Sequence, residues 1–451
     1  MEKRTWTGMM FLLQTRLGRI PWLCVLVASF VLLLFVLQGQ FCSAAIVSDP
    51  DWLGTAPRML STYLQAGWPD VAAGDTGQVI VVWRDKAAAQ PFYDIHTVHS
   101  QNFGVTWSVS SVLSPTLAQS TLPDALIVGE RVFVAWTDQS TGPMGPSYTI
   151  YAGESTTGDS WLTESIPGST SPASSRAHLV ANQDRLYVLF NAGDEIKPDV
   201  LWASRSLSET NWTTAMVAYT HTATSGAFYP VSATSLDGQV LHVVWEERRA
   251  MDDRQVYYMR GTVSGDTVVW EPALNLSPGS SVAVWPAIAV SSNGDVHVVW
   301  GEEIGTNVLG VDYTRYNAAS STWQSPATAI ATGVHVNDET PMYPEPRVEV
   351  HEEDDRILVC VSWHGFAEGE NAEEVHIRCS EDGGQAWWPT ARNVSRTPGP
   401  EQMSIWPSMA FDAGGKLHFV WRESLSVNTH RIYYAQSLDQ TLYLPSVFSL
   451  W

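Results

Sequence analysis

The sequence predicts an all-β protein: a β-propeller of four-stranded antiparallel blades, with seven blades as the leading count and six as the alternative, preceded by one N-terminal hydrophobic helix. Three observations predict this fold. One unit of 50 to 60 residues recurs along the chain. Its apolar runs are too short for helices and are rich in Val, Ile, Tyr and Trp. The last repeat supplies only three strands, and a segment before the first repeat resembles the missing fourth strand, as a closed ring requires.

A short apolar run that ends in an aromatic residue marks each repeat. Successive marker aromatics are 53, 54, 55, 55, 63 and 58 residues apart. The seven runs are Val79–Trp83, Val132–Trp136, Leu186–Phe190, Leu241–Trp245, Val296–Trp300, Leu358–Trp363 and Leu417–Trp421. The first run has no polar residue until Arg84, which indicates a strand buried on both faces. Radially stacked blades bury their strands in this way.

Each repeat contains three further strand-like segments. A run that precedes the marker opens in most repeats with an aromatic–Pro pair, and the third repeat lacks the Pro. These pairs are Trp68-Pro69, Tyr229-Pro230, Trp285-Pro286, Tyr343-Pro344 and Trp406-Pro407, with Leu122-Pro123 as a weaker version. After the marker, a polar loop leads to a third run, and a turn leads to a weak fourth strand. Each unit is therefore interpreted as an up-and-down meander.

The ends of the repeat region predict how the ring closes. The last repeat supplies three strands, and residues 52–61 resemble the fourth-strand segments of other repeats. We therefore expect the N-terminal segment to form the outer strand of the last blade, which pairs an otherwise open edge. Residues 443–445 could compete for that position.

Residues 1–45 have the order of an export signal. Four basic residues precede an apolar run over 20–37, and small residues follow at 42–45. The run is long for a signal peptide and just long enough to cross a bilayer, so a cleaved signal and an uncleaved signal anchor are both open. The predicted domains are this segment, the propeller at 46–440 and a C-terminal tail at 441–451. The protein is predicted to be secreted or membrane-anchored, with its propeller extracytoplasmic and with membrane contact only through the N-terminal segment.

Charge and cysteine content limit the partners and the redox state. The net charge of −22 argues against a nucleic-acid partner, and an anionic polymer is a poor ligand unless local Arg residues override the field. Two cysteines lie beyond the leader, Cys360 and Cys379, on neighbouring predicted strands. The sequence leaves two alternatives for these cysteines, a disulfide between them or two buried thiols.

Two segments fit an Asp-box pattern in the turn between the third and fourth strands. Residues 380–387 match S-x-D-x-G-x-x-W fully, and residues 100–107 match with Asn for Asp. The motif positions are Ser100, Asn102, Gly104, Trp107, Ser380, Asp382, Gly384 and Trp387. The predicted role is structural, because an Asp or Asn side chain accepts backbone N–H bonds in a turn, Gly supplies positive φ, and Trp packs between blades.

With these boxes the chain resembles the Asp-box (BNR-repeat) sialidase-like propellers, over residues 46–440. That family includes sialidases, other glycoside hydrolases and non-catalytic binding proteins. The resemblance implies three Arg residues that hold a substrate carboxylate, a Tyr nucleophile activated by a Glu, and an Asp acid/base. Its F/Y-R-I-P motif is absent from the first repeat, where Gly67 stands two residues before Pro69.

Residues that follow each marker aromatic are expected to share one rim of the channel. On that rim Arg84, Arg248 and Arg422 could hold a carboxylate, with Glu302 and His364 as further ligand contacts. The catalytic candidates are Asp85 or Asp94 for proton transfer, and Tyr313 or Tyr434 paired with Glu247 as nucleophile. The alternative is a solvated ring of mutually paired charges.

No metal site and no cofactor are predicted, although residues 351–355 could hold Ca²⁺ if they are not simply a solvated hairpin tip. The sequence thus favours an exported sialidase-like propeller that binds glycan or protein ligands at its rim, with catalysis not supported by the motifs. An exo-α-sialidase-type glycoside hydrolase is the alternative.

Overall fold

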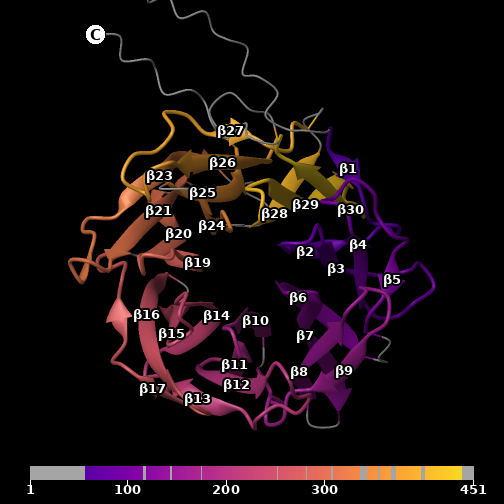
Figure 1. Cartoon of the computed structure of the whole chain (residues 1–451), viewed down its shortest axis with the longest axis horizontal. Helices are drawn as coiled ribbons and strands as arrows, with labels where there is room; N and C mark the ends of the chain where they lie inside the picture. Colours follow the sequence, from indigo (N-terminus) through magenta and orange to yellow (C-terminus); the bar gives the residue numbers. More distant parts are fainter. Residues whose placement is uncertain are drawn as a thin grey trace, which may run out of the picture. The chain divides into compact units, whose positions relative to one another are not determined.

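The computed structural model describes residues 56–438 apart from 115–117, 143–144, 174, 251, 281, 306–307, 336–342, 354–355, 367–371 and 398–401. These residues form seven antiparallel sheets arranged as blades around a central channel (Figure 1). The prediction of a seven-bladed propeller is therefore confirmed. The predicted N-terminal helix and the C-terminal tail lie outside the described residues. Within the described part of the chain, no helix is long and apolar enough to cross a membrane.

Consecutive strands run from the channel outwards in each blade. The first three blades have four strands each: blade 1 contains β2 (Gly67–Ala73), β3 (Val79–Asp85), β4 (Asp94–Ser100) and β5 (Ser111–Val112); blade 2 contains β6 (Gln119–Val128), β7 (Arg131–Gly142), β8 (Gly145–Ser155) and β9 (Leu162–Ser165); and blade 3 contains β10 (Ser175–Ala181), β11 (Arg185–Gly193), β12 (Pro198–Ser206) and β13 (Met216–Tyr219). The next two blades have a fifth strand: blade 4 contains β14 (Gly226–Thr234), β15 (Val240–Ala250), β16 (Asp253–Ser264) and β17 (Thr267–Trp270), with β18 (Leu274–Asn275) also on β16; and blade 5 contains β19 (Ala283–Val290), β20 (Val296–Gly305), β21 (Val308–Asn317) and β22 (Thr322–Trp323), with β23 (Thr328–His335) also on β21. The last two blades again have four strands: blade 6 contains β24 (Arg347–Glu353), β25 (Arg356–Gly365), β26 (Glu374–Ser380) and β27 (Arg392–Asn393); and blade 7 contains β28 (Met403–Phe411), β29 (Leu417–Ser426), β30 (Thr429–Gln436) and β1 (Arg58–Met59).

The two ends of the described chain meet in blade 7. The short strand β1 pairs with β30, with Arg58 opposite Tyr434. The backbone N–H of Leu60 donates to the carbonyl of Ile432 at 2.8 Å, and the N–H of Ile432 donates to Ser61 Oγ at 2.9 Å. The N-terminal segment therefore supplies the outer strand of the last blade, as the sequence predicts, and covers the edge of β30.

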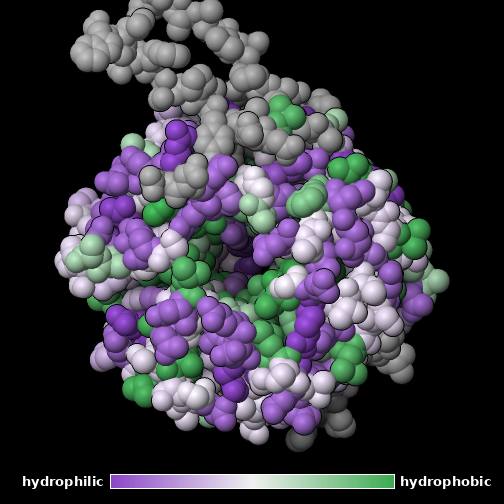
Figure 2. All heavy atoms as spheres, viewed as in Figure 1, coloured by the Kyte–Doolittle hydropathy of each residue, from purple (hydrophilic) through white to green (hydrophobic). Residues whose placement is uncertain are grey.

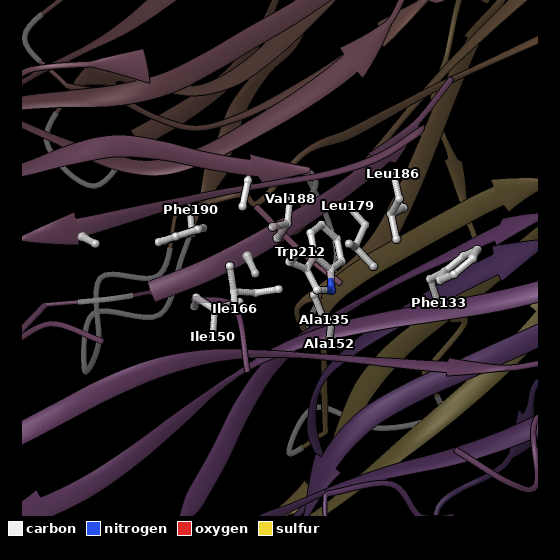
Figure 3. Packing of buried hydrophobic residues seen from close by; sticks show 13 residues of the cluster. Phe133, Ala135, Ile150, Ala152, Ile166, Leu179, Leu186, Val188, Phe190 and Trp212 are labelled. Carbon is white, nitrogen blue, oxygen red and sulfur yellow. The ribbon is translucent and has the colours of Figure 1, made fainter. Parts of the chain in front are cut away.

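The core lies between adjacent blades. The marker aromatics of all seven blades are at most 3% exposed. Figure 3 shows one such interface, in which Phe133 and Ile150 of blade 2 pack with Leu179 and Phe190 of blade 3. Burial of strand residues on both faces explains why the marker runs lack the apolar–polar alternation of a sheet with one face in water.

A bulge in the innermost strand aims one side chain at the channel mouth in most blades. In β2, Gly67 pairs with Arg84 and Asp70 pairs with Val82, so Trp68 and Pro69 both lie opposite Trp83. Positive φ values between 43° and 57° occur at this point in six blades, at Trp68, Leu122, Arg176, Tyr229, Trp285 and Trp406. A bulge re-aims the side chain that it contains. We call this position, including its counterpart in blade 6, the collar.

In blade 6 the collar residue differs from the sequence interpretation. The sequence pattern places the aromatic–Pro pair at Tyr343-Pro344. The strand register instead pairs Arg347 with Ser362, the residue before the marker Trp363, just as Asp70 pairs with the residue before Trp83. Glu345 therefore occupies the collar position, and Pro346 matches Pro69. Two nearby prolines in this repeat explain why the sequence alone selected the earlier pair.

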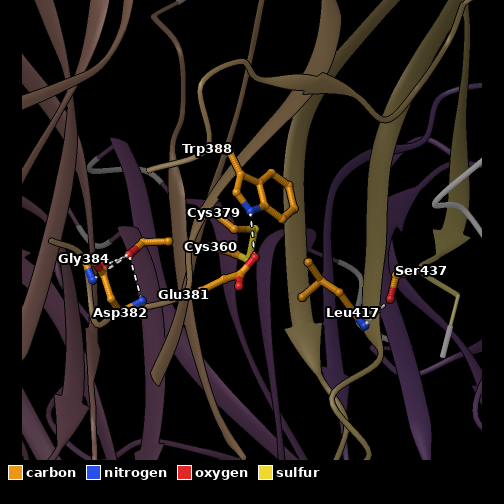
Figure 4. Close-up of a disulfide and its surroundings, with 9 residues drawn as sticks. Cys360, Cys379, Glu381, Asp382, Gly384, Trp388, Leu417 and Ser437 are labelled. Atoms are coloured by element: carbon orange, nitrogen blue, oxygen red, sulfur yellow. Dashed lines mark hydrogen bonds between the residues drawn. A yellow bond between two sulfur atoms is a disulfide. The ribbon is translucent and has the colours of Figure 1, made fainter. Parts of the chain in front are cut away.

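The two Asp-box segments, 100–107 and 380–387, form compact turns at the end of the blade opposite the collar. The N–H of Gly384 donates to Ser380 Oγ at 2.9 Å, and Asp382 Oδ1 accepts from the N–H of Ala386 at 2.8 Å. Ser100 and Asn102 make the same contacts in the first box, at 2.9 and 2.8 Å. Figure 4 shows the second box beside a disulfide that joins Cys360 on β25 to its cross-strand partner Cys379 on β26.

Candidate functional site

Most of the acidic residues that follow the marker aromatics accept a hydrogen bond from the N–H of the marker tryptophan. The indole N–H donates to the carboxylate two residues later in five blades. These contacts are Trp83–Asp85 at 3.3 Å, Trp136–Asp138 at 2.9 Å, Trp245–Glu247 at 2.8 Å, Trp300–Glu302 at 2.7 Å and Trp421–Glu423 at 3.0 Å. Blade 3 has Phe190 as its marker and Ala192 in place of the acid, so both halves of the contact are missing together. The W-x-[DE] pattern was visible in the sequence and signals this structural role.

Among the candidate residues, Asp85, Glu247 and Glu302 therefore serve as acceptors for a buried indole. Asp85 is fully buried and also accepts the backbone N–H of Lys86 at 2.8 Å. Asp94 lies opposite Asp85 in the β3–β4 pair. Burial, together with the charge of Asp138, raises the pKa of Asp94 to about 6.

The two candidate tyrosines lie in the inter-blade core, at the Asp-box end of the blades. Tyr313 and Tyr434 are 0% and 2% exposed, and their hydroxyls are hydrogen-bonded to Nδ1 of His297 and His418 at 2.8 and 2.7 Å. Trp387 of the second Asp box packs edge-on against Tyr313, with ring centres 4.9 Å apart. The structure does not bring either tyrosine to Glu247, because these tyrosines belong to the packing between blades.

Glu247 instead contacts a different tyrosine. The Tyr219 hydroxyl donates to Glu247 Oε1 at 3.3 Å, and Ser225 donates to the same oxygen. Burial and the neighbouring carboxylate raise the pKa of Tyr219. An activated phenol nucleophile requires the opposite shift, because the attacking species is the phenolate.

Arg84 and Arg422 come together at the junction of blades 1 and 7. The rings of Trp68 and Trp406 stack with centres 4.9 Å apart, and each carries a guanidinium on its ring: Arg84 at 3.6 Å from Trp68 and Arg422 at 4.0 Å from Trp406. Burial lowers the pKa of both arginines to about 10, so both remain charged at neutral pH. The Nε atoms of both are buried without a hydrogen-bond partner among the described residues. Two charged guanidinium groups at one place suit an anionic ligand.

Two further arginines, Arg176 and Arg347, reach the mouth from the inner strands of blades 3 and 6. With the collar tryptophans and Glu345 they line a cavity of about 20 Å³ in the collar. Burial raises the pKa of Glu345, and the charges of Arg176, Arg347 and Arg422 oppose that shift. Asp70 and Asp124 line the same cavity, so three carboxylates stand among these guanidinium groups. The sequence interpretation missed Arg176, Arg347 and Glu345, because it searched only the residues after the marker aromatics.

Two further predicted rim residues are Arg248, which lies apart from Arg84 and Arg422, and His364, which lies beside Arg422. Arg248 in blade 4 donates from Nε and Nη2 to Glu246 Oε1 at 2.9 and 2.7 Å, so its charge is paired. It does not join Arg84 and Arg422. His364 is fully buried on β25, and burial together with the charge of Arg422 lowers its pKa to about 3. A neutral His364 therefore lies next to the arginine cluster.

A larger cavity of about 180 Å³ lies along the inner strands and shares Asp70, Asp124, Arg176 and Arg347 with the collar. Asp70 Oδ2 accepts the N–H of Ala125, and Asp124 Oδ2 accepts the N–H of Leu179, both at 2.7 Å. Each of these aspartates therefore ties its inner strand to the next blade. Figure 2 shows the central hollow, with hydrophilic residues inside it.

Metal ligands do not gather in the described part of the chain. Within that part, no group of three or more His, Cys, Asp or Glu side chains could hold a metal ion. Residues 351–353 of the acidic segment form the end of β24, and residues 354–355 lie outside the described residues.

Comparisons with known proteins support the fold class. No family model matches the sequence, and no curated protein matches it. A PL25 ulvan lyase bound to a glucuronate–sulfated rhamnose chain is similar in structure, with a TM-score of 0.58 at 13% identity over 86% of this chain and 100% of the lyase chain. The polysaccharide lyase Uly1 gives a TM-score of 0.51 at 11% identity over 86% and 95%. Trypanosoma rangeli sialidase gives 0.45 at 8% identity over 83% of this chain and 55% of that one, a likeness too low to carry an argument. The likeness to the two polysaccharide lyases therefore supports the propeller fold of this chain.

Proposed function

We propose that this protein binds acidic carbohydrate at the channel mouth, through the cluster of Arg84, Arg422, Trp68 and Trp406. The observation that carries the proposal is the stacked pair Trp68–Trp406 with one guanidinium on each ring, Arg84 on Trp68 and Arg422 on Trp406. Guanidinium groups bind carboxylate or sulfate through paired, charge-assisted hydrogen bonds. Trp68 and Trp406 are both partly exposed, and their rings offer a sugar an apolar surface beside the arginines.

The charge distribution favours an anionic ligand at this place rather than elsewhere on the surface. The chain as a whole carries a net charge of −22. At the mouth, however, four arginines are grouped: Arg84, Arg422, Arg176 and Arg347. Three carboxylates stand beside them, Glu345, Asp70 and Asp124, and burial raises the pKa of each. A cluster of arginines on a negatively charged molecule favours an anionic group at the mouth over an anionic group elsewhere on the surface.

Isothermal titration calorimetry tests the proposal. The probes are oligosaccharides of glucuronate and 3-sulfated rhamnose, the chemistry bound by the ulvan lyase of similar fold, and oligogalacturonates of equal length. We expect the wild type to bind at least one acidic series, and Arg84→Ala and Arg422→Ala each to weaken binding by about tenfold or more, since a charge-assisted hydrogen bond is worth about 1.5–3 kcal/mol.

Matched controls separate this site from general charge effects. Arg260→Ala removes a partly exposed arginine that pairs with Glu271 at 3.3 Å, away from the mouth, and should leave binding unchanged. Polyglutamate supplies carboxylates without sugar rings and should bind more weakly than the acidic sugars. Failure of the wild type to bind either sugar series, or equal losses in Arg260→Ala and Arg84→Ala, would overturn the proposal.

A further inference from the structure

The collar presents a second aromatic platform that the proposed function does not use. Tyr229 of blade 4 and Trp285 of blade 5 stack with ring centres 4.3 Å apart and an interplanar angle of 17°. We call this pair platform B, and the pair Trp68–Trp406 platform A. All four rings are partly exposed and come from collar positions with positive φ. The same bulge therefore builds both platforms.

Each platform carries two arginines. Platform A has Arg84 and Arg422 on its rings, as described above. On platform B, Arg176 lies 5.7 Å from the centre of the Trp285 ring, and Arg248 lies 6.0 Å from that of Tyr229. A stacked aromatic pair with guanidinium groups beside it therefore occurs twice around one channel, although on platform B the charge of Arg248 is already paired with Glu246.

The two platforms lie on opposite sides of the channel. Figure 1 places β2 and β28, which carry platform A, across the central opening from β14 and β19, which carry platform B. The three remaining collar residues are Leu122, Arg176 and Glu345, so none of them offers an aromatic face. Stacking is thus restricted to two opposite positions.

The cavity that the two platforms share is too small for a sugar ring. Trp68 and Trp406 of platform A and Trp285 of platform B line the same cavity of about 20 Å³. That volume holds about one water molecule and excludes a pyranose ring. A ligand that contacts both platforms must therefore lie across the mouth instead of descending into the channel.

We propose that the mouth takes an internal stretch of an acidic polysaccharide chain, with one sugar ring against platform A and another against platform B. This inference rests on the proposed function and specifies its ligand. A single terminal sugar that stacks on platform A leaves platform B empty. A chain that crosses the mouth fills both platforms and places acidic groups beside the arginines of each.

Two leucine variants test the inference, because Leu122 occupies the same collar position in blade 2 with φ near that of the tryptophans. Trp406→Leu removes half of platform A, and Trp285→Leu removes half of platform B. Binding of di-, tetra- and hexasaccharides of the two acidic series is measured for each variant by calorimetry. Trp388→Leu serves as the matched control, because Trp388 also packs against an arginine, Arg392, but lies beyond the Asp box of blade 6.

We expect the hexasaccharide to bind the wild type at least about a hundredfold more tightly than the disaccharide, and each platform variant to lose about tenfold or more of the hexasaccharide affinity. Thermal unfolding of each variant reports whether it folds, and a second substitution at platform B, Tyr229→Leu, replaces Trp285→Leu if that variant does not fold. The inference is wrong if the disaccharide binds as tightly as the hexasaccharide, or if only platform A affects binding. If no acidic sugar of any length binds the wild type, the proposed function itself fails.

Discussion

The guanidinium carbon of Arg84 lies 3.6 Å from the centre of the Trp68 ring, near the contact distance of two stacked planar groups. Gly67 makes this approach possible, because a Cβ there would stand 3.2 Å from the Trp406 ring and 3.4 Å from Arg84 Nε. Arg84 is thereby held in one orientation at the mouth, with its Nε enclosed and without a partner in the described structure.

The planar shape of Arg84 should matter as much as its charge. Arg84→Lys keeps the positive charge but loses the flat, forked group that stacks on Trp68 and binds an anion with two parallel hydrogen bonds. We expect Arg84→Lys to recover little of the acidic-sugar affinity lost in Arg84→Ala. Calorimetry of both variants, with circular dichroism to check folding, measures this. Full recovery in the lysine variant would show that charge alone accounts for the contribution of Arg84.

Gly384 should be one of the positions least tolerant of a side chain. Its φ is +85°, and a Cβ there would lie 1.9 Å from the Tyr313 hydroxyl oxygen. Gly384→Ala should lower the free energy of unfolding by more than about 2 kcal/mol, because it adds an overpacked contact to an unfavourable backbone conformation. Gly333→Ala is the matched control, since Gly333 has a φ of +72° but nothing within 4 Å of its Cβ position. Chemical denaturation should show a clearly smaller loss for Gly333→Ala.

The Trp300–Glu302 contact predicts strong coupling between the two side chains. Glu302→Ala leaves the Trp300 indole N–H without its acceptor and should cost about 1–3 kcal/mol of stability. In Trp300→Phe that N–H is gone, as it is naturally in blade 3, where Phe190 is followed by Ala192. The double variant should therefore be more stable than the sum of the single effects by about 1 kcal/mol or more. Strict additivity in denaturant unfolding would contradict this role for Glu302.

Glu349 predicts a pH dependence of stability. Burial and the nearby Asp70 raise the pKa of Glu349 to about 8, whereas an unfolded glutamate titrates near 4.5. Between these values the folded state retains a proton that the unfolded state has released, so raising the pH favours unfolding. The effect is complete above about pH 8 and absent below about pH 4.5. Glu349→Gln cannot titrate and should remove this loss.

The measurement compares the two proteins by denaturant unfolding at pH 6, 7.5 and 9. We expect the wild type to lose at least about 1 kcal/mol relative to Glu349→Gln over this range, because one unit of pKa shift corresponds to 1.36 kcal/mol. Because the two proteins are compared at each pH, the contributions of titrating groups that do not interact with Glu349 cancel, such as that of Asp124, whose pKa burial raises to about 7. A constant difference from pH 6 to pH 9 would contradict the assignment.

The repeat pattern of the sequence determined the seven blades, the closing strand near residue 58 and the turn positions of the Asp boxes. These features follow from local information: a marker run such as Val79–Trp83 must be buried on both faces, and its spacing fixes the size of the blade. The same logic correctly placed Cys360 and Cys379 on neighbouring strands.

Only the tertiary structure decided which polar residues meet. Arg84 and Arg422 are 338 positions apart in the sequence and become neighbours only when blade 7 closes against blade 1. Tyr313 and Glu247 have the chemistry of a nucleophile pair, yet blade packing separates them and gives each another partner. A repeat specifies the strand on which a residue lies, but the register of each bulge and the closure of the ring decide which side chains face the same space.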